Sequence, residues 1–167
     1  MRVSTKDLPE AYRPSATKEQ AQQAKPFEDL PIILRPHAHL PFPPRMHWGY
    51  AIPIESLLDI AVEKMGYKIP DIPESELLPG CPPYNDLFVS NLAMIFLENH
   101  VEHDMQLDYQ IVFCEGEITY VISICSSWEH CPKALDTAKR LADYFGMTES
   151  PKWYLDYHLW HWRRFKK

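Results

Sequence analysis

The sequence predicts an α+β fold in which one antiparallel sheet packs against helices. Stretches in which apolar residues alternate, the pattern of strands, are interspersed with stretches in which they recur at helical spacing. Apolar residues make up 46% of the 167 residues, and the length suits one domain with a single core. The 16 prolines gather in separate regions, where regular elements are not expected.

Prolines set the first 45 residues apart. Apolar residues are few before Phe27, and six prolines occupy positions 26, 31, 36, 41, 43 and 44. Because proline lacks an amide donor and fixes φ, this segment is neither a central strand nor a long helix. We expect a short helix within residues 16–25 and then an extended arm that covers apolar surface. The predicted division is a Pro-rich N-terminal arm, residues 1–45, and a single α+β domain, residues 46–167.

The first half of the domain contains one strand and two helices. Aromatic and β-branched residues predict a strand over residues 48–52. Pro53 suits the first turn of a helix, whose apolar residues recur at helical spacing until Gly66. After a loop with five prolines, a second helix is expected over residues 85–101, starting from an asparagine that is a good N-cap. Its apolar residues lie on most sides, which indicates burial.

The second half contains a hairpin, a helix and a last strand. Alternating apolar residues predict strands over residues 107–114 and 118–125, joined by a tight turn. A helix follows over residues 132–145 with one apolar stripe. Residues 152–162 place large rings at both sets of alternating positions, so we expect a strand with both faces buried.

Without the additional helix at 85–101, the order is βαββαβ, which resembles that of ferredoxin-like domains. That resemblance implies an antiparallel sheet with helices on one face and an open second face. The last strand would present His158 on the open face, together with Tyr154, Asp156, Trp160 and Trp162. An exposed aromatic patch of this kind is typical of an interface or a binding groove.

The element order also resembles the dimeric α+β-barrel proteins over residues 46–162. That resemblance implies a homodimer whose sheets pack face to face around apolar pockets. Its members include cofactor-independent monooxygenases, polyketide cyclases and haem-degrading enzymes, often with a pocket histidine. The inserted helix and the arm depart from that pattern, and either one can cover the open face. The segments Trp48-Gly49-Tyr50 and Pro151-Lys152-Trp153-Tyr154 resemble uncharacterised small proteins of mushroom-forming fungi, a likeness that implies no activity.

Charge argues against binding to nucleic acids. The net charge is −6, and residues 46–150 carry 17 acidic but only 5 basic side chains. This acidic region repels a phosphate backbone. We expect the basic residues from 163 onward to act as a solubilising terminus. No apolar run approaches the roughly 18 residues of a membrane span, and the start is polar. We therefore expect a soluble cytoplasmic protein whose four cysteines are free thiols.

Histidines and cysteines form three groups that are close enough in sequence for metal binding. These groups are His37 and His39, followed by His47; His100, His103 and Asp104; and Cys125, His130 and Cys131. The first reads as a polar loop, and the second as cations that complement a helix C-terminus. The third lacks the two-residue gap and the second close pair of a structural zinc site. A position near a helix start would lower the pKa of the Cys131 thiol and make it reactive, but we favour a structural role in packing for these cysteines. No metal and no cofactor is expected.

Two function classes follow. The first is a binding or interaction module without catalysis, which holds a small apolar or aromatic ligand or a protein partner. Its binding residues would be Trp48, Tyr50, Trp160 and Trp162, because aromatic rings stack on flat ligands. The second is a small-molecule enzyme that uses His158 or His47 as acid–base, with Tyr154 as a helper. RNA stacking on the aromatic sheet is a weaker third hypothesis that the acidic charge opposes.

Overall fold

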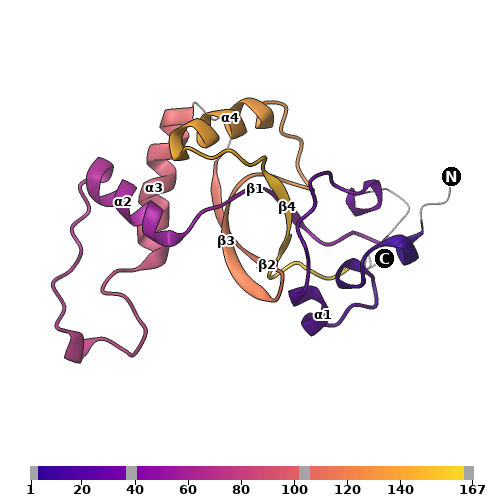
Figure 1. The fold of residues 1–167 in the computed structure, drawn as a ribbon, viewed down its shortest axis with the longest axis horizontal. Helices are drawn as coiled ribbons and strands as arrows, with labels where there is room; N and C mark the ends of the chain where they lie inside the picture. Colours follow the sequence, from indigo (N-terminus) through magenta and orange to yellow (C-terminus); the bar gives the residue numbers. More distant parts are fainter. Residues whose placement is uncertain (1–3, 37–40, 102–105, 164–167) are drawn as a thin grey trace.

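The computed structural model describes residues 4–36, 41–101 and 106–163, and its fold is α+β as predicted (Figure 1). The helices are α1 (Lys18–Gln22), α2 (Ile54–Met65), α3 (Asp86–Val101) and α4 (Ala134–Phe145). The strands are β1 (Met46–Ala51), β2 (Asp108–Cys114), β3 (Glu117–Ser126) and β4 (Lys152–Asp156). Within the described ranges, none of the helices has the length and apolarity to span a membrane.

The four strands form an antiparallel sheet that closes into a barrel. β1 pairs with β3, β3 with β2, β2 with β4, and β4 again with β1. The closing contact is short, since only Val112 opposite Asp156 and Phe113 opposite Leu155 join β2 to β4. The expectation of an open sheet with a free aromatic face was therefore wrong. Because β4 pairs with a strand on each of its two edges, the sheet closes into a barrel.

β4 is shorter than the sequence pattern indicates, because Asp156 ends it. Its Oδ1 accepts the backbone N–H of His158 at 2.7 Å and that of Leu159 at 2.6 Å. A side-chain oxygen that accepts hydrogen bonds from the following backbone N–H groups favours a turn, and those N–H groups are then not available for pairing with a neighbouring strand. The strand predicted up to residue 162 was wrong beyond Asp156, and His158 does not share a strand face with Tyr154.

A register shift between Trp48 and Gly49 determines which side chains face the barrel interior. His47 lies opposite Ser126, but Gly49 lies opposite Ser123, so β3 contains one extra residue at the bulge. Both serines therefore share the side of the sheet on which His47 lies, although they are three positions apart. Gly49 allows this close approach, because a Cβ there would overlap the Ile122 carbonyl oxygen.

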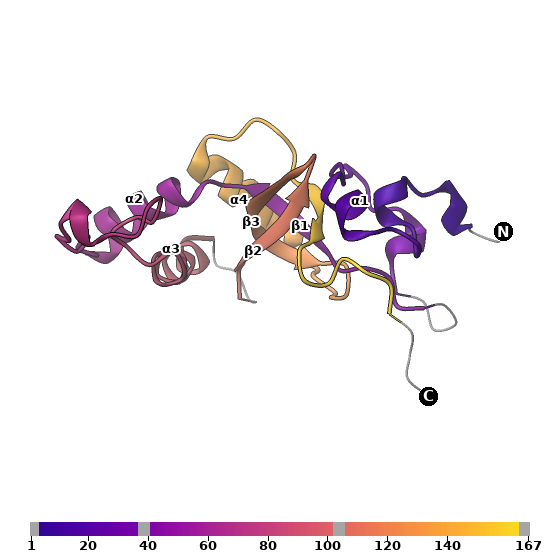
Figure 2. The ribbon, with the colours of Figure 1, turned by 90° about the horizontal axis from the view of Figure 1, so that it is seen from below.

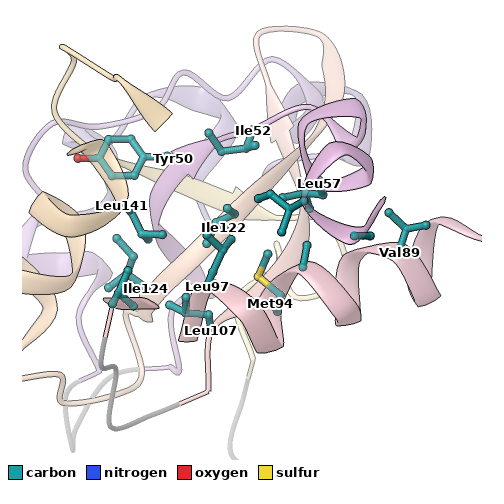
Figure 3. Close-up of a cluster of buried hydrophobic side chains, with 14 of the residues drawn as sticks. Tyr50, Ile52, Leu57, Val89, Met94, Leu97, Leu107, Ile122, Ile124 and Leu141 are labelled. Atoms are coloured by element: carbon teal, nitrogen blue, oxygen red, sulfur yellow. The ribbon is translucent and has the colours of Figure 1, made fainter. Parts of the chain in front are cut away.

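Helices α2, α3 and α4 cover one side of the barrel, where the larger core lies. Figure 3 shows apolar side chains of all three helices meeting those of β1 and β3, among them Leu57, Leu97, Leu141 and Ile122. The predicted helix ends are confirmed: α2 follows Pro53 and stops at Gly66, whose φ of 69° suits a residue without Cβ. The long helix α3 packs against α2, and its buried residues are distributed along most of its length.

Residues 4–36 form what we call the N-terminal cap, which packs on the opposite side of the barrel (Figures 1 and 2). Instead of the extended arm predicted from residue 27, the chain makes a turn of 3-10 helix at Ile32–Leu34. Tyr12, only 1% exposed, donates its hydroxyl to the Lys25 carbonyl at 2.6 Å. The cap buries apolar residues together with three from the barrel strands, which are Met46, Phe113 and Leu155.

Candidate functional site

The barrel interior combines an apolar part with a buried polar group. Val112, Val121 and Tyr154 pack together inside. Beside them lie His47, Ser123 and Asp156, which are 0%, 6% and 3% exposed. Buried polar side chains are stable only when they are hydrogen-bonded, so their partners decide what this group can do.

His47 is bonded through both of its ring nitrogens. Nδ1 lies 2.9 Å from Ser123 Oγ, and Nε2 lies 2.7 Å from Asp156 Oδ2. Burial alone would raise the pKa of Asp156, but the hydrogen bonds from His47 and from two backbone N–H groups outweigh it and hold the pKa below its usual value. Asp156 is thus a carboxylate at neutral pH. The Ser–His–Asp group has the contacts of an acid–base relay, yet its histidine has no surface open to a substrate.

An open cavity of about 700 Å³ lies between the N-terminal cap and the start of α4, beside β1 and β4. Trp48 of β1 and Trp153 of β4 lie on its wall, directly opposite each other in the sheet. Their ring centroids are 6.3 Å apart, with the planes tilted by 35°. Both indoles are half-buried, which leaves part of each ring open to a ligand.

The polar part of the cavity wall is the turn that follows β3. Glu129 accepts the backbone N–H of Ser126 through Oε2 at 3.0 Å, and its Oε1 lies 3.9 Å from Arg45 Nη2. Burial would raise the pKa of Glu129, but hydrogen bonding with Ser126 and the charges of Arg45 and His47 lower it.

The structure separates the aromatic residues that the sequence proposed for binding. Trp48 lines the cavity, whereas Tyr50 is 5% exposed within the helix-side core. Trp160 and Trp162 pack on the N-terminal cap, and Trp162 donates its Nε1–H to the Tyr12 carbonyl at 2.9 Å. Of the four, Trp48 is therefore the one on the cavity wall.

The acid–base candidates are also divided. His47 and Tyr154 lie opposite each other in the β1–β4 ladder and both face the interior. Burial and the nearby Cys114 raise the pKa of Tyr154 to about 12, although a hydrogen bond to the Ala51 backbone acts in the other direction. His158 is exposed, rests edge-on against Tyr157 and does not line the cavity.

Sequence reasoning missed the partners of these residues. Ser123 is buried between Ile122 and Ile124 of β3, and Asp156 is buried next to Leu155 of β4. Such a polar residue in an apolar strand is the signal that was present. The contact between Ser123 and His47 could not be predicted from the sequence, because it depends on the bulge in β3.

The candidate metal ligands either lie outside the described ranges or have too few partners to hold an ion. His37, His39, His103 and Asp104 lie outside them, and His100 stacks on Phe96. Cys125, His130 and Cys131 all line the cavity. Across the described residues, no group of three or more His, Cys, Asp or Glu side chains is placed to hold a metal ion.

Comparisons of the chain with protein-family models, with curated proteins and with solved structures found no match. The cavity and the buried polar group therefore have to be interpreted from their own chemistry.

Proposed function

We propose that the protein is a small-molecule-binding module and that its ligand occupies the cavity whose wall carries Trp48 and Trp153. The two neighbouring indoles on this wall are the observation that carries the proposal. A volume of about 700 Å³ lies within the usual range of small-ligand sites. Two partly open aromatic rings in such a cavity offer a surface on which a flat molecule stacks.

The wall favours a ligand with an apolar body and a polar edge. Trp48, Trp153 and Leu135 provide apolar surface, while Asp29 and Arg35 from the N-terminal cap provide charged groups of both signs. Charged side chains at the rim orient a ligand through hydrogen bonds, and the indoles supply most of the contact area. We infer a flat apolar or aromatic ligand that carries hydrogen-bonding groups along one edge.

Native mass spectrometry of the purified protein is the direct test, complemented by titration with the neutral dye Nile red. We expect a bound small molecule, or saturable dye binding, that weakens at least tenfold in Trp48→Ala. Trp160→Ala is the matched control, because Trp160 packs on the N-terminal cap away from the cavity. Equal loss of binding in both variants, or no loss in either, would count against this site.

A second variant avoids any effect on the fold. Leu135 lines the cavity but is 77% exposed, so Leu135→Glu leaves the core intact. A carboxylate at that position disfavours an apolar ligand, and we expect weaker binding with unchanged thermal unfolding. Binding that persists unchanged in Leu135→Glu and Trp48→Ala would place the ligand elsewhere.

The enzymatic alternative rests on the His47 hydrogen bonds with Ser123 and Asp156. A histidine between a carboxylate and a hydroxyl is an arrangement that supports proton transfer. Chemistry there requires that a substrate reach a ring that is now fully buried. Conversion of the co-purified ligand that is lost in folded His47→Asn but kept in His158→Ala would favour the enzyme over the binding module.

The ferredoxin-like element order and a homodimer remain predictions. The same native mass spectrum reports the oligomeric state. A dimer that dissociates when the cavity is emptied would connect assembly to ligand binding, whereas a ligand-bearing monomer would show that one chain completes the site.

A further inference from the structure

The turn after β3 brings two cysteines together. Cys125 lies near the end of β3, and Cys131 comes just before α4. Between them, the Glu129 N–H donates to the Ser126 carbonyl at 3.1 Å, and the Glu129 side chain accepts the Ser126 N–H at 3.0 Å. These two bonds hold the turn between the cysteines, and Cys125 donates its thiol to the Ser126 carbonyl at 3.4 Å. Both cysteines lie on the wall of the same cavity, near enough for their side chains to interact.

Both cysteines line the cavity, but they differ in access. Cys125 is 9% exposed, whereas Cys131 is half-buried, so a reagent in the cavity meets Cys131 first. The other two cysteines, Cys81 on an exposed loop and Cys114 on β2, do not line it. Replacing them by serine restricts thiol chemistry to the cavity pair.

We propose that Cys125 and Cys131 form a reversible disulfide on the cavity wall, made by exchange with a small disulfide of the glutathione type. In the first step the Cys131 thiolate attacks the small disulfide, a mixed disulfide forms, and one glutathione thiol leaves. In the second step Cys125 loses its proton and its sulfur attacks the Cys131 sulfur, which releases the second glutathione. The protein loses two protons and two electrons, and one oxidised glutathione becomes two reduced ones.

The second step needs the Cys125 thiolate. Burial, with the interaction with Cys131, raises the pKa of Cys125 well above that of an ordinary thiol. Since only the thiolate attacks a disulfide, closure accelerates as pH rises. The neighbours that face the pair include Glu129, whose negative charge acts in the same direction.

The disulfide has a direct effect on the aromatic wall. Cys125 lies opposite Trp48 in the β1–β3 ladder, and opposed residues of a ladder are in side-chain contact. A disulfide beside an indole quenches its fluorescence by accepting an electron. Oxidation is therefore expected to lower Trp48 emission, and Trp48→Phe is the control that removes this change.

The test uses the full chain with Cys81→Ser and Cys114→Ser, incubated in glutathione buffers of increasing oxidised fraction. We expect an intact mass lower by two hydrogens, a cross-linked peptide containing Cys125 and Cys131, and full reversal by dithiothreitol. Adding Cys125→Ser should stop the reaction at a stable glutathione adduct on Cys131. A parent protein that also stops at the adduct, or that cross-links only between two molecules, would overturn the proposal.

A second measurement needs no oxidation. A trivalent arsenical such as phenylarsine oxide binds two neighbouring thiols as a chelate. We expect it to bind the reduced protein at least tenfold more tightly than Cys125→Ser or Cys131→Ser, with circular dichroism confirming that the variants fold. Equal binding to all three would show that the two thiols cannot meet.

Discussion

Asp156 Oδ2 lies 2.7 Å from His47 Nε2 inside the barrel, and this contact joins β4 to β1 by side chains as well as by the backbone ladder. The same carboxylate holds the backbone turn that ends β4. One buried side chain thus sets the length of a strand and satisfies the polar group in the interior.

Asp156→Asn tests how much this contact contributes to stability. The asparagine oxygen can still accept a backbone N–H, but the charge that faces buried His47 is lost. A hydrogen bond to a charged group contributes about 1.5–3 kcal/mol, and we expect a loss of that order in the free energy of unfolding by urea. His158→Ala is the control, since an exposed side chain should change stability by less than about 0.5 kcal/mol.

The same contact predicts how stability depends on pH. The pKa of Asp156 is lower in the folded protein than the roughly 3.9 of an unfolded chain. Its contribution is therefore present above about pH 4 and is lost as pH falls through the folded-state pKa. Urea unfolding between pH 7 and pH 3 should show a decline that is shallower in Asp156→Asn. Parallel curves for the two proteins would contradict this assignment.

Gly49→Ala tests the close approach of β1 to β3. The new Cβ would overlap the Ile122 carbonyl oxygen, which is backbone and cannot move without breaking the ladder. We expect a loss of roughly 3 kcal/mol or more in unfolding free energy. Gly66→Ala separates steric from conformational causes, because nothing lies near that Cβ and only the positive φ, costing about 1–2 kcal/mol, opposes it. Similar losses in both would refute the steric explanation.

Removal of residues 1–45 tests whether the predicted domain, residues 46–167, is stable alone. The N-terminal cap buries Phe113 and Leu155 completely, and Phe27 pairs with Trp153 through two backbone hydrogen bonds of 2.8 and 3.0 Å. Without the cap, this apolar surface meets water. We expect the truncated chain to bind 8-anilinonaphthalene-1-sulfonate and to unfold at lower temperature. A truncated chain as stable as the full one would show that the cap is a separate unit.

Local pattern was sufficient for most elements. Helix α2 begins after Pro53 and ends before Gly66 as expected, because proline and glycine act on the backbone of their immediate neighbours. The hairpin of β2 and β3 agrees for the same reason, since its alternation and its turn are encoded within a short stretch. The prediction of the last strand was wrong beyond Asp156. The Asp156 side chain accepts backbone N–H groups there and so ends the strand that the alternating aromatic rings indicated.

The candidate site was predictable only in part. Trp48, named from the sequence as a binding residue, lies on the cavity wall, and His47 and Tyr154, named as acid–base candidate and helper, lie opposite each other in the β1–β4 ladder. The cavity itself forms between the N-terminal cap and the turn before α4, segments about a hundred residues apart in the chain. No periodicity within one segment reports such a contact.

The sequence by itself determined the α+β class, the helix limits and the hairpin, because these depend on backbone preferences and apolar spacing over a few residues. Only the tertiary structure decided that the sheet closes, that a bulge turns Ser123 toward His47, and that Cys131 returns to Cys125. Those features depend on which strands pair and in which register. Register is set by the fit of side chains brought together from distant positions, so it becomes visible only when the whole chain is folded.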